Sequence, residues 1–154
     1  MTCQTIMLSN PITILESAGL ADAIDLLFRH RIKSLPVVNA NGLYQGLFGI
    51  HTLVRELLPR AATLDGDARI GDLAFVHDTL ESFKERLTGR LAEPVIQFAD
   101  TTLRPLVPEM SLVETLLHLH RYHHNLPVVD PQTGRLLGFV TYWSVLARLA
   151  DRTA

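Results

Sequence analysis

The sequence predicts an α/β protein in which two β-α-β-β-α repeats pack together about a pseudo-twofold axis. The main observation is a stretch written twice, as "SLPVVNANG" at residues 34–42 and as "NLPVVDPQTG" at residues 125–134. Each copy follows an amphipathic helical pattern and leads into a second apolar strand and a closing helix. A strand, helix and strand in one sheet form a right-handed parallel crossover, and one such unit cannot bury its sheet alone.

The first repeat is expected to occupy residues 1–58. In "LADAIDLLFRH" the apolar residues recur at the spacing of one helix face, so residues 20–30 are expected to be helical. The proline of the next strand, residues 35–39, cannot donate a ladder hydrogen bond and belongs at a strand start or a sheet edge. The remaining elements follow in order: a turn at Gly42, a strand in "LYQGLFG" and a helix in "IHTLVRELL".

The second repeat is expected to occupy residues 94–154. Ser111 and Glu114 have the spacing of a capping box before a helix at residues 112–121. A strand at residues 126–130, a glycine turn, a strand in "RLLGFV" and a helix in "TYWSVLARLA" follow. The prolines of the two copies are 127 − 36 = 91 positions apart, and the glycines of the next strands are 138 − 46 = 92 apart. The differences fall in loops, where a change of length is tolerated.

Residues 59–93 belong to neither repeat. Small residues and glycines predict a loop in the first part of this segment. "DTLESFKERLTGR" predicts that a helix follows at about residues 78–89. Asp78 is expected to cap this helix, Glu81 completes a capping box, and Gly89 ends the helix. Its apolar stripe indicates that it covers a face of the pair, or alternatively that it binds a partner or a second copy.

Composition limits the classes of protein to which the chain can belong. Hydrophobic residues make up 47% of the chain and the formal net charge is −2, so nothing indicates binding to nucleic acid or to an anionic membrane. No apolar run approaches the ~18 residues of a membrane span, and the N-terminus lacks the pattern of a secretion signal. Cys3 is the only cysteine and is expected in a mobile terminus. We therefore expect a soluble cytoplasmic protein.

Motifs for catalysis and metal binding are weak. The sequence has no nucleophile elbow, no phosphate-binding glycine loop and no metalloprotease helix, so we expect no enzymatic activity. Four histidines cluster in "HLHRYHH", at His118, His120, His123 and His124. The helix is expected to end near Arg121, and no Asp, Glu or Cys inside the cluster completes a ligand set, so we expect no metal site. A metal-dependent or hydrolytic enzyme is the least favoured alternative.

The repeated stretches resemble the CBS-domain pair. "LPVVDPQTGRLLGFVTYWSVL" at residues 126–146 is similar to that family's strand, glycine turn, short strand and closing helix. "LPVVNANGLYQGLFGIHTLV" at residues 35–54 follows the pattern more loosely, and "IMLSNPITI" looks like the start of a first repeat. The resemblance covers about residues 5–58 and 94–150, and it implies a stand-alone tandem CBS module with a regulatory function.

The resemblance also implies a ligand, because CBS pairs of this kind commonly bind AMP, ADP, ATP or S-adenosylmethionine. It implies two clefts, each between the first residues of one repeat's closing helix and the residues before Leu-Pro of the other repeat. The residues are Lys33, Ser34, Thr141 and Ser144 in the cleft expected to be preferred, and Gly49, Thr52, His124 and Asn125 in the second cleft. The charge of Lys33 and the hydroxyl of Thr141 favour a phosphate in the first cleft.

The sequence departs from the family pattern at the residue expected to bind ribose. Thr52 and Ser144 stand where the family has an aspartate. A hydroxyl is uncharged and accepts fewer hydrogen bonds than a carboxylate, so we expect weaker recognition of ribose.

Two functional hypotheses follow from the sequence. The first is a non-enzymatic regulatory module that senses an adenosine-type nucleotide or another small anionic ligand and acts in trans on a partner such as an enzyme or transporter. The second is a ligand-free dimerisation or scaffold module whose clefts have degenerated. In both cases a homodimer is expected, since the closing helix carries an apolar face that includes Trp143, Leu146 and Leu149.

Overall fold

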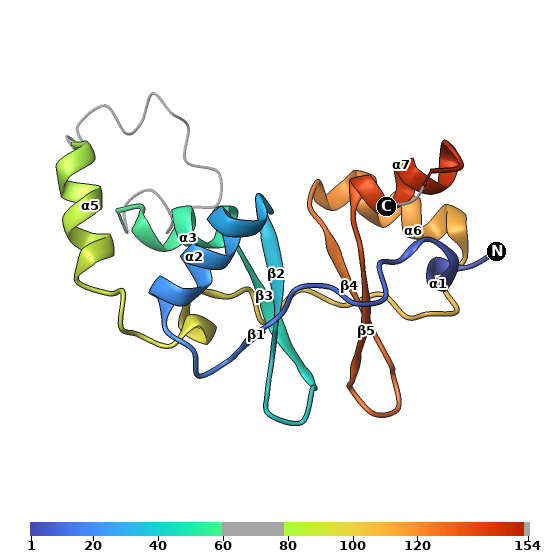
Figure 1. Cartoon of the computed structure of the whole chain (residues 1–154), viewed down its shortest axis with the longest axis horizontal. Coiled ribbons are helices and arrows are strands. Elements are labelled where there is room, and N and C mark those ends of the chain that lie inside the picture. Colours follow the sequence, from blue (N-terminus) through green and yellow to red (C-terminus); the bar gives the residue numbers. More distant parts are fainter. Residues whose placement is uncertain (60–78, 153–154) are drawn as a thin grey trace.

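The computed structural model describes residues 1–59 and 79–152 and has the predicted α/β fold (Figure 1). The elements of the first repeat are α1 (Cys3–Ile6), β1 (Ile14–Leu15), α2 (Leu20–His30), β2 (Ser34–Val38), β3 (Tyr44–Gly49) and α3 (Ile50–Leu57). Helix α5 (Leu80–Thr88) follows, and then come the 3₁₀ helix η2 (Val95–Phe98), α6 (Leu112–Tyr122), β4 (Leu126–Val129), β5 (Leu136–Val140) and α7 (Tyr142–Leu149). The predicted helices are confirmed, and the predicted Leu-Pro strands are confirmed to within one residue.

Each repeat has its own small sheet. In the first, β1 lies parallel to β2, and β2 pairs antiparallel with β3. In the second, β4 pairs antiparallel with β5, and the strand equivalent to β1 is reduced to a parallel bridge between Leu106 and Val128. The parallel β1–α2–β2 crossover is the one that the repeat pattern predicts. Figure 1 shows the helices gathered beside one end of the strands in both repeats.

The two β-hairpins meet at the opposite end of the strands. Their turns contain Gly42 and Gly134, whose φ angles of 77° and 76° lie in the left-handed region that glycine adopts without strain. A bridge joins Leu43 to Arg135, and these residues are equivalent because 135 − 43 = 92. When a residue pairs with its own equivalent, the symmetry axis passes between the two. The pseudo-twofold axis therefore passes between the hairpins.

The repeats exchange short segments across this axis. Helix α1 comes first in the chain, but Cys3 and Ile6 are buried in the core of the second repeat. In return Val95 and Phe98 of η2 are buried in the core of the first repeat. The expectation of a mobile Cys3 was therefore wrong: its side chain is fully buried, and its amide donates to the Met110 carbonyl at 2.8 Å.

Backbone bridges fix both exchanged segments in the same way. Leu8 forms two backbone hydrogen bonds with Phe139 in β5, and Asp100 forms two with Leu47 in β3. The differences 100 − 8 and 139 − 47 both equal 92, so the two contacts are related by the pseudo-twofold axis. These extra backbone pairs extend each sheet with a segment from the other repeat.

Helix α5 lies over the first repeat. Its N-cap is Thr79, whose hydroxyl accepts from the Ser82 amide at 3.2 Å, and the expected cap Asp78 lies outside the described residues. Leu87 packs against the first core, and the Arg86 guanidinium donates to the Leu57 carbonyl at 3.0 Å. The helix therefore contacts the first core and the end of α3 through Leu87 and Arg86, whereas Leu80 of the predicted apolar stripe is 68% exposed. No helix in the described ranges is both long enough and apolar enough to span a membrane.

Candidate functional site

A pocket of about 560 Å³ lies between the two repeats at the helical end of the strands. It is lined by Lys33, Ser34, Ile50, His51, Tyr122, His123, His124, Asn125 and Tyr142. Lys33 is equivalent to His124, since 124 − 33 = 91, and Ile50 is equivalent to Tyr142, since 142 − 50 = 92. Because equivalent positions face the same space, this axial pocket is shared by both repeats and has a volume typical of small-ligand sites.

The axial pocket contains a buried hydroxyl with no internal partner. Ser34 begins β2 and pairs with Gly49, the residue that precedes α3. The side chain is 3% exposed, and its Oγ has no hydrogen-bond partner among the described residues. A buried polar group without a partner costs about 1–3 kcal/mol, so such a hydroxyl in a pocket wall indicates a position for a polar ligand atom.

Gly49 allows the chain to pass close to the edge of the axial pocket. A Cβ atom at this position would lie 2.9 Å from both the Lys33 carbonyl oxygen and Ser34 Cβ. The Ile50 amide donates to that same Lys33 carbonyl at 3.0 Å. Gly49 therefore has a structural role in placing Lys33 and Ser34 beside the start of α3, and it does not itself line the pocket.

Two histidines from different repeats stack at the axial pocket. The rings of His51 and His124 have centroids 5.0 Å apart and an interplanar angle of 17°. Burial lowers the pKa of His51 below its usual value, the nearby His124 and Arg55 lower it further, and Asp100 has the opposite effect. His51 is therefore mainly neutral at pH 7 in the ligand-free protein.

The residues expected to contact ribose use their hydroxyls within the protein. Thr52 is buried, and its Oγ1 accepts from the Gly49 amide and donates to the Gly49 carbonyl, both at 3.0 Å. Ser144 Oγ accepts from the Thr141 amide at 3.0 Å and donates to the Thr141 carbonyl at 2.9 Å. Thr141 Oγ1 in turn accepts from the Ser144 amide at 2.9 Å. These hydroxyls cap α3 and α7, which explains why Thr or Ser is suitable at these positions.

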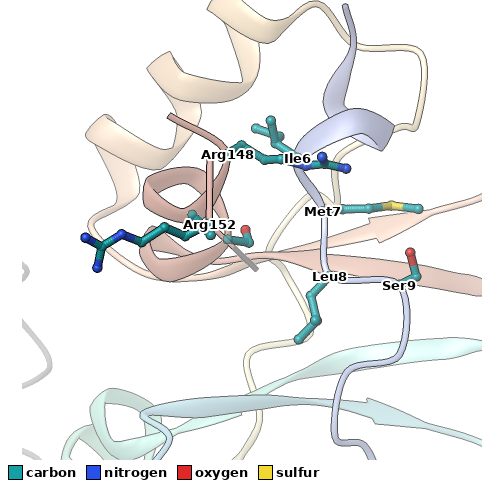
Figure 2. A pocket seen from close by; sticks show the side chains of 8 residues that line it. Ile6, Met7, Leu8, Ser9, Arg148 and Arg152 are labelled. Carbon is teal, nitrogen blue, oxygen red and sulfur yellow. The ribbon is translucent and has the colours of Figure 1, made fainter. Parts of the chain in front are cut away.

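A second hollow, of about 330 Å³, lies between the N-terminal segment and α7 (Figure 2). Its lining includes Ser144 and Arg148 together with Met7 and Leu8 of the exchanged segment. Figure 2 shows Arg148 extending toward Ile6. Ser144 thus faces this hollow and does not line the axial pocket.

The predicted site residues are distributed differently from the two expected clefts. The axial pocket brings together Lys33 and Ser34 of one expected cleft with His124 and Asn125 of the other. The other four expected residues, Gly49, Thr52, Thr141 and Ser144, do not line it. The reason is that the segments before Leu-Pro from both repeats lie next to the same axis, so residues of both segments line one pocket.

Five further residues line the axial pocket that the sequence did not assign to a ligand site: Ile50, His51, Tyr122, His123 and Tyr142. Ile50 and Tyr142 are the first residues of the closing helices, one position after the expected Gly49 and Thr141, and His51 follows Ile50. A signal was present, because the residue at the start of each closing helix was already expected to face the ligand.

The histidine cluster on α6 forms no metal site in the part of the chain that is described. No group of three or more His, Cys, Asp or Glu side chains there could hold a metal ion. The helix ends at Tyr122, one residue later than expected, and His123 adopts a left-handed conformation with φ 55°. This change of direction turns His124 away from the helix and toward His51.

Comparison with protein families identifies both repeats. The family model for the CBS domain matches residues 3–59 and residues 97–151. No curated protein sequence matches the chain significantly.

Solved structures with the same fold include several CBS pairs. The CBS-pair protein CBSX2 from Arabidopsis thaliana is 20% identical, with a TM-score of 0.70, over 99% of this chain and 98% of that chain. CBSX2 in complex with AMP is 22% identical, with a TM-score of 0.66, over 97% of each chain. The CBS domain pair of protein MJ0100, in complex with methylthioadenosine and S-adenosyl-L-methionine, is 16% identical, with a TM-score of 0.63, over 97% of this chain and 99% of that chain. At these identities the likeness concerns the fold.

Proposed function

The chain belongs to the CBS-domain family as a tandem pair, and from this we propose that it is a regulatory module that binds a small anionic ligand in the axial pocket. An adenosine-type nucleotide such as AMP is the first candidate, because one related structure contains AMP and another contains S-adenosyl-L-methionine. CBS pairs are generally regulatory and not catalytic, so the bound state acts through a partner protein in trans.

The buried hydroxyl of Ser34 is the observation that carries this proposal. It lies in the wall of a pocket shared by both repeats, where it has no partner among the described residues. The exposed Lys33 beside it supplies a positive charge. The helices α3 and α7 begin at the same pocket, where their N-terminal amides favour negative charge. A ligand contacting these groups would connect the two repeats, and its binding would change how they are held together.

Calorimetric titration with AMP, ADP, ATP and S-adenosylmethionine tests the proposal. Lys33→Ala should weaken nucleotide binding by about tenfold or more, because a charge-assisted contact contributes about 1.5–3 kcal/mol. The matched control is Lys84→Ala on α5, since Lys84 is exposed and pairs with Glu81. Binding to the Lys33 and Ser34 alanine variants with unchanged affinity would show that this pocket is not the site.

A ligand-free scaffold is the second candidate, and the helix caps favour it. The hydroxyls of Thr52 and Ser144 are used to cap α3 and α7 and do not replace the ribose-binding carboxylate. If none of the four nucleotides binds or raises the melting temperature, the scaffold is the better description. A ligand present at 100 times its dissociation constant stabilises a protein by ~2.7 kcal/mol, which a thermal melt detects readily.

A further inference from the structure

The axial pocket has an electrostatic character that depends on pH. Among the described residues that line it, none is acidic; Lys33 is cationic, and the three histidines His51, His123 and His124 become cationic when protonated. Other groups act on His51 from outside the pocket lining: Asp100 from the segment after η2, and Arg55 from α3. The ring of Tyr122 lies 6.0 Å from that of His124.

The hydrogen bonding of His124 determines what it can offer a ligand. Its Nδ1 lies 3.0 Å from the Asn125 carbonyl oxygen. A carbonyl only accepts, so Nδ1 carries the proton and Nε2 of the neutral ring is an acceptor. Only the protonated ring has an Nε2–H that can donate to an anion. Binding of an anion at Nε2 therefore requires protonation of His124.

Repulsion between the protonated rings of His51 and His124 couples proton uptake to anion binding. Two imidazolium rings with centroids 5.0 Å apart disfavour each other's charge. An anion that contacts both rings would offset this repulsion. Protonation of His51 beside a protonated His124 is thus disfavoured without an anion and favoured with one.

We propose that the axial pocket binds one phosphate group per chain, held by Lys33, the Ser34 hydroxyl and the protonated His51–His124 pair, so that binding takes up protons. The phosphate is either free or part of a nucleotide, and the nucleotide case rests on the function proposed above. One ligand per chain follows because the pocket lies on the pseudo-twofold axis and is lined by both repeats.

The direction of the pH dependence follows from linkage. Anion binding raises the pKa of His51 above its value in the ligand-free protein, in which burial and the neighbouring His124 lower it. The gain in affinity is complete at pH values below the pKa of His51 in the ligand-free protein. It is lost as the pH rises through the pKa of His51 in the anion-bound protein. The expected window lies around and below the usual histidine value of about 6.5.

Calorimetric titration with sulfate, AMP and adenosine at about pH 5.5 and about pH 8 tests this inference. Sulfate is the main probe, because it keeps two negative charges across this range, whereas a phosphate monoester takes up a proton near pH 6. Sulfate and AMP should bind with a stoichiometry of one, and sulfate should bind about tenfold or more tightly at the lower pH. Adenosine, which lacks a phosphate, should show no such pH dependence.

Variants distinguish the histidine pair from a general effect of pH. His51→Gln and His124→Gln should each remove most of the pH dependence of sulfate binding. His30→Gln is the matched control, because His30 is exposed at the end of α2 and does not line the pocket. Equal sulfate affinity at both pH values, or an unchanged pH dependence in both histidine variants, would overturn the inference.

The same titrations separate this inference from the proposed function. Equal AMP binding at both pH values without sulfate binding would overturn the inference and leave the proposed function standing. Sulfate binding with the expected pH dependence, but without binding of any nucleotide, would support the anion site and contradict a nucleotide sensor. Binding of neither sulfate nor any nucleotide would contradict both.

Discussion

At the scale of single residues, Ser34 connects stability with binding. Its buried Oγ lacks a hydrogen-bond partner among the described residues, a condition that costs about 1–3 kcal/mol. Ser34→Ala should therefore leave the stability of the ligand-free protein unchanged or raise it by up to ~1 kcal/mol. The same change should reduce the stabilisation produced by a ligand. Urea denaturation with and without AMP measures both effects, and a clear loss of ligand-free stability would contradict this account.

Asp100 stabilises the segment that crosses into the first repeat. Its Oδ1 accepts from the Thr102 amide at 2.9 Å, the Thr102 hydroxyl at 2.7 Å and the Leu103 amide at 3.2 Å. Partial burial raises the pKa of Asp100, but these hydrogen bonds and the charge of Arg55 outweigh it and hold the pKa below its usual value. The ionised form is thus favoured in the folded protein.

We expect Asp100→Ala to lower the free energy of unfolding by about 1–3 kcal/mol at pH 7. The folded pKa is depressed, so this contribution is present above the unfolded value of about 3.9 and disappears as the pH falls through the folded pKa. Urea denaturation at about pH 7 and about pH 3 should show a larger difference from wild type at the higher pH.

Asp25→Ala is the control for this prediction. Asp25 lies on α2, where it is exposed and pairs with Arg29, an arrangement that contributes little to stability. An equal loss of stability in both variants at pH 7 would show that the hydrogen bonds of Asp100 have no special role.

At the scale of elements, the exchanged segments depend on glycines in β3 and β5. A Cβ atom on Gly138 would lie 2.6 Å from Met7 Sδ and 2.8 Å from the Leu8 carbonyl oxygen. The equivalent Gly46 is less crowded, with the Asp100 carbonyl oxygen at 3.0 Å. Each glycine allows the other repeat's segment to pair with the strand, and the N-terminal segment passes closest.

Gly138→Ala should therefore lower the free energy of unfolding by about 1–3 kcal/mol, because the Leu8 backbone cannot move without breaking its hydrogen bonds to Phe139. Gly89→Ala is the control, since Gly89 has φ −67° and a Cβ atom there would lie no closer than 3.5 Å to a neighbouring atom, the Glu85 carbonyl oxygen. The control should change stability by no more than about 0.5 kcal/mol. Similar thermal melts for the two variants would contradict this account of the exchange.

The elements themselves were predictable from the sequence, but the exchange of segments was not. The period of apolar residues in 20–30 and 112–121 and the repeated Leu-Pro-Val-Val strands are local signals. The pairing of Leu8 with Phe139 uses backbone groups 131 positions apart (139 − 8), and no side-chain pattern marks it. The fold was therefore predicted correctly, while the burial of Cys3 was not.

The candidate site was predicted in part for a related reason. Sequence position identified Lys33, Ser34, His124 and Asn125, which line the axial pocket. It did not show that residues before Leu-Pro from both repeats line one pocket, since this depends on how the repeats dock. The capping role of Thr141 and Ser144 could have been recognised, because their spacing of three residues is that of a capping box.

At the scale of the whole molecule, the helical end of the second repeat leaves an apolar surface exposed. On α7, Trp143 is 77% exposed, Leu146 52% and Leu149 74%. Contiguous apolar surface of this kind marks an interaction site on most soluble proteins. We propose that it forms the interface of a homodimer, as the sequence already suggested for the closing helix.

Trp143→Lys combined with Leu149→Lys should convert this dimer into a monomer. Each change places a charge in an apolar interface, and a buried tryptophan often contributes about 2 kcal/mol or more to binding. The dissociation constant of the dimer should therefore rise at least about thirtyfold. Gln132→Lys, on the exposed turn between β4 and β5 at the other end of the strands, adds a charge without touching this surface (Figure 1). Light scattering should give a dimer for the wild type and for Gln132→Lys and a monomer for the double variant, with circular dichroism confirming that all three fold. A monomeric wild type at roughly tens of micromolar, a concentration at which micromolar interfaces are largely occupied, would contradict the dimer.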